Sequence, residues 1–280
     1  MFVWKRSPDP KKELRQLVGD YELPSFSTTA VATLSLLREE ADLTRVADRI
    51  MTDPGLSVRV LRTVNSAAFG MRQQVTNLQH ATSLLGRSRV EALVLTAAVG
   101  DALPTPAGLD LGDFWQTSAR RACLARQIAN RVSAPTAMES FTAGLLQDMA
   151  VPLMAAARQK EYLSILQTAA DDPSLTLRSV EEETLGYDHA QVGAVMAEAW
   201  DLPESLITAI ADHHRPGERA PAAVEAVAYV PHGPQPEELT GLRGYCVKTL
   251  GVQEDVLDGM IERASSEAIS LGESMTGRPA

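Results

Sequence analysis

Amphipathic helical periodicity runs through almost the whole chain and limits it to a helical fold. Apolar residues recur every three or four positions in one segment after another, each preceded by a residue suited to starting a helix. The expected helix starts are Ser27, Thr44, Asp53, Ser88 and Thr136, the last two as capping boxes. Since no hairpin signal and no alternating strand pattern interrupts these segments, the sequence predicts an all-α protein.

Two segments rich in proline and glycine divide the predicted helices into groups. DALPTPAG at 101–108 lies between helices expected at 88–100 and 113–131, and we predict a boundary between two helical lobes there. YVPHGPQP at 229–236 is expected to be a surface connection, with a loop over a pocket as the alternative. The predicted parts are an N-terminal extension at 1–22, lobes at about 23–103 and 113–230, and C-terminal helices at 237–272 that pack on the second lobe.

The last predicted helix, from Glu254 to about Leu271, carries one apolar stripe. Most amphipathic helices bury such a stripe within their own chain, so we expect packing on the body of the protein. A second chain is the alternative, which leaves a homodimer open.

The net charge of the chain argues against a nucleic-acid partner. The formal net charge is -10, from 36 acidic and 26 basic side chains, and it would repel a phosphate backbone. A local basic patch is the alternative, because one predicted helix carries four arginines: Arg120, Arg121, Arg126 and Arg131. Adjacent arginines point in different directions on a helix, so we interpret them as solvated side chains and expect no nucleic-acid partner.

Cysteine usage and the lack of long apolar runs indicate the compartment. Cys123 and Cys246 have no CxxC spacing, which argues against a disulfide framework or a zinc knuckle and favours a reducing compartment. No segment resembles a signal peptide, and no apolar run approaches the roughly 20 residues of a membrane span. We therefore expect a cytoplasmic protein without a membrane span.

A series of ordered motifs resembles one protein family. LPSF at 23–26 and DPGLSVRVLRTVNSAAFG at 53–70 come first, and the NSA within the second is especially characteristic. The later motifs are VTNLQHA at 75–81, LLG at 84–86, FWQTS at 114–118, GLLQD at 144–148, GYDHAQVG at 186–193, WDLP at 200–203 and HH at 213–214. Their order is similar to that of the HDOD family, the HD-related output domains of bacterial signalling. The resemblance covers 23–214 and implies an N-terminal helical bundle followed by an HD-domain-like helical bundle.

The resemblance also implies a degenerate relative of the HD phosphohydrolases. In a catalytic HD site, imidazoles and a bridging carboxylate hold divalent metal, which lowers the pKa of bound water for attack on a phosphoester. By the resemblance, Thr117 and Gln147 stand at two histidine positions, and no aspartate lies near Val227. We therefore expect no enzyme activity, no catalytic residue, no bound metal and no cofactor.

Four residues of the HD constellation remain, and with Thr117 and Gln147 they define the predicted remnant pocket: Asp148, His189, His213 and His214. Each has a structural explanation, which we favour. Asp148 lies at a helix end, His189 follows the N-cap Asp188, and the last two would meet the negative end of a helix dipole as imidazolium ions. Gln147 is expected to hydrogen-bond Asp148 or a neighbour. A weak site for zinc, iron or nickel is the alternative.

Three functions are compatible with these residues. The leading hypothesis is a non-catalytic signal-transduction module that binds a signalling protein of unknown identity, as the resemblance implies. The second is a sensor whose remnant pocket binds a nucleotide or another small molecule. The third is a residual metal-dependent phosphohydrolase. We also expect a stand-alone output domain, because no receiver, cyclase or DNA-binding module is visible in the chain.

Overall fold

Every regular element in the described part of the chain is a helix. The computed structural model describes residues 8–19, 21–172, 174–215, 217, 219–231 and 239–276, and within them it contains no strand. The all-α prediction is confirmed. The first elements are α1 (Pro10–Val18), α2 (Thr28–Arg38), α3 (Leu43–Met51), α4 (Pro54–Val64), η1 (Ala67–Phe69), α5 (Leu78–Leu85) and α6 (Arg87–Ala102).

The remaining elements follow the segment at 103–110. They are α7 (Leu111–Val132), η2 (Ala134–Thr136), α8 (Ala137–Leu146), α9 (Ala150–Ala157), α10 (Gln159–Asp171), α11 (Leu177–Leu185), α12 (His189–Ala199), α13 (Glu204–Asp212), α14 (Ala222–Val227), α15 (Thr240–Lys248) and α16 (Glu254–Thr276).

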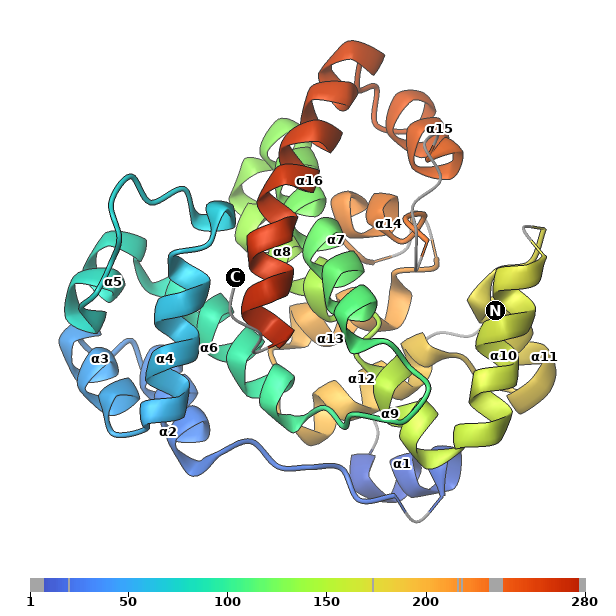
Figure 1. Cartoon of the computed structure of the whole chain (residues 1–280), viewed down its shortest axis with the longest axis horizontal. Coiled ribbons are helices and arrows are strands. Elements are labelled where there is room, and N and C mark those ends of the chain that lie inside the picture. The colour runs from blue at the N-terminus through green and yellow to red at the C-terminus, as the bar shows by residue number, and fades with distance from the viewer. Residues whose placement is uncertain are drawn as a thin grey trace.

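Helices α2 to α6 form the N-terminal bundle, which lies at one side of the molecule (Figure 1). A loop within it is fixed by one side chain. The Asn65 amide donates from Nδ2 to the Val75 carbonyl at 2.8 Å, and its Oδ1 accepts from the Val75 N–H at 2.7 Å. The NSA motif therefore begins with a residue that joins the end of α4 to the approach to α5.

The second bundle is built around α7, which lies near the centre of the molecule (Figure 1). Helices α8 and α14 pack on α7, and α12 packs on α13 and α9. The N-terminal helix α1 packs on α12, so a segment ahead of the family-like motifs covers the second bundle. This bundle carries every residue of the predicted pocket.

Helix α16 packs along α7 and also contacts α4 and η1 of the first bundle. Its apolar stripe is buried in the chain, with Leu257, Ala264, Ala268 and Leu271 all fully covered. Part of the predicted C-terminal region, at 237–238, lies outside the described residues, as do residues 232–236 of the second breaker segment.

Three helix starts differ from the sequence prediction in their capping residue. Asp42, not Thr44, caps α3, because its carboxylate accepts the Thr44 N–H at 2.7 Å. Helix α6 begins after Gly86, whose φ of 74° suits glycine, so Ser88 lies inside the helix. Thr136 does precede α8, but its hydroxyl donates to the Ser133 carbonyl and makes no cap bond. A different residue occupies the cap position of α3 and of α6, and Thr136 keeps its position before α8 without a side-chain cap bond. Residue spacing alone did not predict these differences.

Both cysteines are free and fully buried. Burial raises the pKa of each thiol to about 12, so neither Cys123 nor Cys246 carries the thiolate that metal binding or redox chemistry needs. No helix in the described ranges combines the length and apolar character required to cross a bilayer.

Candidate functional site

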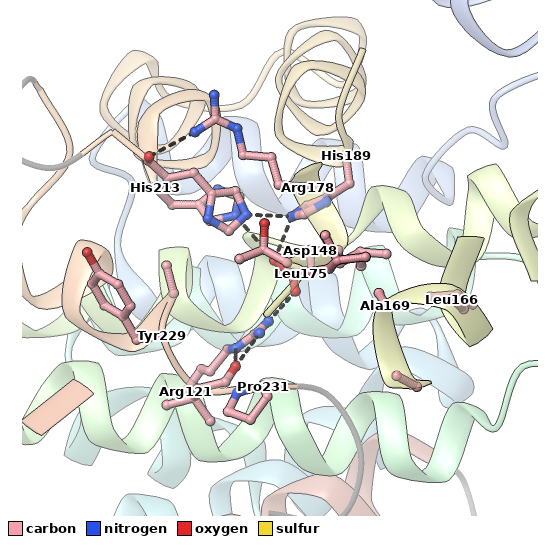
Figure 2. Close-up of a pocket in the computed structure, with 16 residues that line it drawn as sticks. Arg121, Asp148, Leu166, Ala169, Leu175, Arg178, His189, His213, Tyr229 and Pro231 are labelled. Atoms are coloured by element: carbon pink, nitrogen blue, oxygen red, sulfur yellow. Dashed lines mark hydrogen bonds and ion pairs between the residues drawn. The ribbon is translucent and has the colours of Figure 1, made fainter. Parts of the chain in front are cut away.

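Four segments of the second bundle converge on one polar cluster (Figure 2). Arg121 reaches it from α7, Asp148 from the junction of α8 and α9, His189 from the start of α12, and His213 with His214 from the end of α13. Except for the half-buried His214, these side chains are almost completely buried. The fold therefore brings together four of the six residues predicted for the pocket.

Local helix signals determine where the histidines lie. Asp188 caps α12, with its carboxylate accepting the Gln191 N–H at 2.8 Å, and the Gln191 side chain accepts the Asp188 N–H in return. His189 is therefore the first helical residue, as predicted. His213 is the C-cap of α13, and its Nδ1 lies 2.7 Å from the Ile210 carbonyl oxygen in the last turn.

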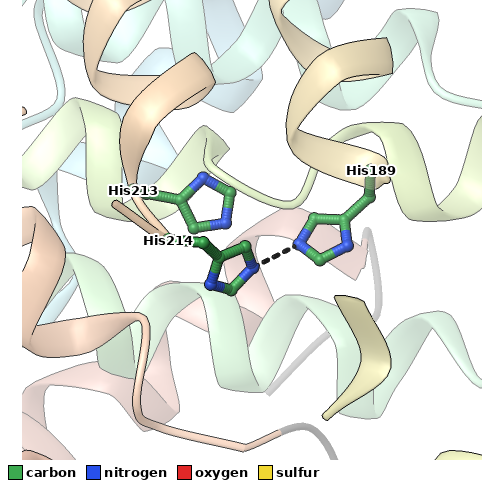
Figure 3. A group of neighbouring side chains, drawn as sticks. All are labelled: His189, His213 and His214. Carbon is green, nitrogen blue, oxygen red and sulfur yellow. Dashed lines mark hydrogen bonds between the residues drawn. The ribbon is translucent and has the colours of Figure 1, made fainter. Parts of the chain in front are cut away.

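The three imidazole rings lie together in one group (Figure 3), and two of them lie near the Asp148 carboxylate. Nε2 of His189 lies 2.9 Å from Nε2 of His214. Oδ1 of Asp148 lies 3.5 Å from Nε2 of His189 and 3.4 Å from Nε2 of His213. The cluster thus concentrates three imidazole nitrogens and one carboxylate oxygen in a small buried volume.

Arg121 holds the other side of the same carboxylate. Its Nη1 donates to Asp148 Oδ2 in a buried ion pair, and its Nε donates to the Val230 carbonyl at 3.0 Å. Nη2 donates to that carbonyl as well. One guanidinium therefore joins α7 to the aspartate of the GLLQD motif and to the chain segment after α14.

A second buried carboxylate lies behind His189. Glu181 Oε2 lies 2.6 Å from His189 Nδ1 and accepts the His189 N–H at 2.9 Å, while Oε1 accepts the hydroxyl of Tyr162. Glu181 and Tyr162 are fully buried. This pair fixes the orientation of the His189 ring, because carboxylate contact at Nδ1 leaves only Nε2 directed at the cluster.

The charges of the cluster follow from burial and from each other. Burial alone would raise the pKa of Asp148, but Arg121 and then His189 hold it well below its usual range. Burial likewise opposes charge on His189, yet Glu181 and Asp148 raise its pKa well above the ordinary histidine value. Burial, His213 and His189 all lower the pKa of His214.

At neutral pH the cluster therefore holds a carboxylate at Asp148, an imidazolium at His189 and a neutral ring at His214. His189 donates its Nε2 proton to His214 and its Nδ1 proton to Glu181. The expected imidazolium at His214 is wrong, because the helix-end position is desolvated and already lies beside other cationic groups.

A cavity of about 510 Å³ opens beside the cluster. Asp148, the three histidines, Arg121 and Arg178 form its polar floor (Figure 2). Apolar and aromatic residues form the rest of the wall, among them Leu166, Ala169, Leu175, Leu177, Tyr229 and Pro231. Tyr229 and Leu175 are 44% and 36% exposed and lie where the cavity meets the surface.

Thr117 and Gln147 are buried but do not line this cavity. The Gln147 amide has no hydrogen-bond partner at either atom in the described part of the chain, so the expected bond to Asp148 is absent there. Asp148 instead faces Arg121 and the histidines, and Gln147 is left with two unsatisfied polar atoms in the interior.

A comparison with protein-family models identifies the chain. The model of the HDOD domain matches residues 23–216. The chain belongs to the HDOD family. In sequence, this HDOD chain is 24% identical over 178 residues to an uncharacterized protein of Treponema pallidum (strain Nichols). That match covers 62% of this chain and 34% of the other, so the HDOD chain spans about a third of that relative.

Solved structures share the HDOD fold over nearly the whole chain. A candidate phosphohydrolase from Shewanella amazonensis SB2B has a TM-score of 0.72 at 24% identity, with 94% of this chain and 97% of the other covered. An HDOD protein of unknown function from Geobacter sulfurreducens has a TM-score of 0.70 at 21% identity, with 95% and 96% covered. A candidate signal transduction protein from Marinobacter aquaeolei VT8 has 0.72 at 19%, with 97% and 62% covered.

The sequence did not identify three residues that organise the site. Arg121 was interpreted as a solvated arginine, although it follows Thr117 by four positions and so shares its helix face. That spacing was the available signal. Glu181 and Tyr162 lie outside the family-like motifs, and no local pattern predicts that they meet His189.

The bond between Tyr162 and Glu181 gives a testable prediction. Tyr162→Phe is expected to lower the free energy of unfolding by about 1–2 kcal/mol, because it removes one donor from a buried carboxylate. Urea denaturation measures the change. Tyr229→Phe is the control, since that hydroxyl makes no hydrogen bond within the described ranges. Equal losses in the two variants would contradict the role of this bond.

Proposed function

We propose that this HDOD chain is a non-catalytic regulatory module of signal transduction that acts by binding a partner protein. The observation that carries the proposal is the Arg121–Asp148 ion pair. In a two-metal hydrolase, ions about 3.5–4 Å apart stabilise the attacking and the leaving oxygen. A carboxylate that bridges two such ions binds one ion with each of its oxygens. In this chain one of the two Asp148 oxygens, Oδ2, already accepts a hydrogen bond from the buried Arg121 guanidinium.

The energetic cost of releasing that oxygen supports the same proposal. Arg121 has almost no exposure to solvent, and its guanidinium also holds the Val230 carbonyl. Breaking a buried ion pair costs about 3–5 kcal/mol, because an uncompensated charge remains. A second metal ion would have to displace Arg121 against that cost and would then lie beside its positive charge.

A hydrolysis assay tests the proposal. The wild-type chain is incubated with Mn(II), Fe(II) or Zn(II) and with a generic phosphodiester, nucleotides and cyclic dinucleotides. We expect no product above the level of a sample lacking protein. Metal-dependent turnover that Asp148→Asn abolishes and His80→Ala preserves would contradict the proposal and support a phosphohydrolase.

The cavity supports a second candidate, a sensor of small molecules. Its polar floor and apolar walls have the character of a ligand site, and 510 Å³ lies within the volumes typical of such sites. Tyr229 at the rim offers an aromatic face to a planar ligand. A thermal-shift screen of nucleotides and metabolites tests this function: a ligand should raise the Tm of the wild type and not that of Tyr229→Ala.

A further inference from the structure

We propose that the partner protein docks on the surface of α12 that α1 covers, and that it inserts a short basic amphipathic helix in the place of α1. The inference rests on the proposed function, because it names the surface and the kind of partner for the same regulatory module. Helix α1 lies at the edge of the molecule, on the outside of the second bundle (Figure 1). It belongs to the segment ahead of residue 23, where the match to the HDOD model begins.

The sequence of α1 describes the helix that this surface accepts. Leu14 and Val18 are one turn apart on the same face, and they are the two buried side chains of α1. Lys11, Lys12 and Arg15 are exposed. Two apolar anchors at positions i and i+4, opposite a charged outer face, are a pattern by which amphipathic helices bind a partner surface.

Charge favours a basic helix at this position. Helix α1 carries three basic residues and one acidic residue, which gives it a net charge of +2. Because the whole chain has a formal net charge of -10, the other residues together carry -12. A basic segment is attracted to such a body, and an acidic segment is repelled from it.

Helix α1 is held weakly enough to be replaced. It has 9 residues, and isolated helices shorter than about 12–15 residues are marginal in water, so α1 depends on docking for its helical structure. Two buried side chains must offset the conformational entropy that the whole helix loses. Near its end, the Leu17 carbonyl accepts the Tyr187 hydroxyl, and Arg158 Nη2 lies 3.4 Å away, which is long for a hydrogen bond.

The chain beyond α1 is anchored independently of it. Trp200, the C-cap of α12, donates from Nε1 to the Pro24 carbonyl at 2.9 Å, and its ring stacks on Phe26 with the centroids 4.7 Å apart. Helix α1 can therefore leave α12 while the N-terminal bundle stays in place. A partner helix that docks there gains the Tyr187 hydroxyl, the donor that the Leu17 carbonyl uses.

A labelled peptide tests the replacement of α1 in the full chain. The probe is a synthetic peptide of residues 9–19 with a fluorophore at its N-terminus, and fluorescence anisotropy measures its binding. An α1 that is docked about nine-tenths of the time leaves about one-tenth of the wild-type sites open, so Leu14→Asp/Val18→Asp should bind the peptide at least about 10-fold more tightly than the wild type. Equal affinity for the two chains, or no binding to the folded variant, would overturn the proposal.

Matched controls separate the docking surface from a general effect of charge. Lys12→Asn/Gln16→Asp changes the charge of the chain by the same amount at exposed positions of α1, and it should bind the peptide like the wild type. A peptide that carries Leu14→Asp and Val18→Asp should bind none of the chains. A peptide with Lys11→Glu and Lys12→Glu should bind more weakly, most clearly at low salt, and unchanged binding would reject a basic partner.

Hydrogen exchange of the wild type provides a test that does not depend on the folding of a variant. The amides of α1 should exchange at least about 100-fold faster than those of α12, because α1 opens without global unfolding. Equal protection of the two helices would overturn the proposal. The hydrolysis assay is separate from both measurements: turnover would reject the regulatory function, whereas an inert chain whose variant fails to bind the peptide would reject this docking surface alone.

Discussion

Replacing Arg121 with methionine is expected to lower the free energy of unfolding by about 3–5 kcal/mol, because the change leaves Asp148 as an uncompensated buried charge. The substitution also removes the donors that hold the Val230 carbonyl. Chemical denaturation at neutral pH measures the loss. A loss below about 1 kcal/mol, the value typical of an exposed ion pair, would contradict the central position that we assign to Arg121.

Arg120 provides the matched control for this prediction. It precedes Arg121 on the same helix, is only partly buried, and forms no ion pair in the described part of the structure. Arg120→Met should change stability by less than about 1 kcal/mol, as is usual for surface substitutions. The double variant Arg121→Met/Asp148→Asn should recover much of the loss of Arg121→Met, because both charges are then removed together.

The second large effect is expected at Gly144, where α8 crosses α7. A Cβ atom at this position would lie 3.1 Å from the Arg121 carbonyl oxygen and 3.2 Å from the Ala125 Cβ. Gly144→Val must push α8 away from the α7 backbone, and such overpacking costs about 1–3 kcal/mol or more. The Tm measured by differential scanning calorimetry should fall accordingly. Because Asp148 follows on the same chain segment, the ion pair to Arg121 should weaken too.

Gly244 on α15 is the control for steric crowding. A Cβ atom there meets nothing within 4 Å, so Gly244→Val tests a helical glycine in open space. Its effect should stay within about 0.5 kcal/mol and be slightly stabilising, because glycine is a poor helix former. If Gly144→Val were as harmless as Gly244→Val, the close crossing of the two helices would be contradicted.

Local sequence patterns were sufficient to predict the all-α fold and the first residues of several helices. Ser27 and Asp53 cap α2 and α4, and Asp188 caps α12, because each needs only its own side chain and the next turn of backbone. Thr44 and Ser88 are not capping residues, because Asp42 and Gly86 occupy the N-cap positions of α3 and α6. The HDOD motifs predicted an N-terminal bundle followed by an HD-like bundle. The family model confirms the family resemblance over residues 23–216.

Only part of the candidate site could be predicted from the sequence. Motif positions named Asp148, His189, His213 and His214, which the fold brings together. The partners that determine their charges come from distant segments, since Arg121 and Glu181 meet the cluster only through tertiary packing. Helical spacing places residues on a face, but it does not say which face of another helix will oppose them.

Anomalous diffraction from crystals soaked in Mn(II) or Zn(II) tests the central claim most directly. We expect Arg121 to remain within hydrogen-bond distance of Asp148, with at most one ion per chain, located among His189, His213 and His214. Two ions bridged by Asp148, with the Arg121 side chain displaced from the carboxylate, would contradict the account and restore a two-metal hydrolase.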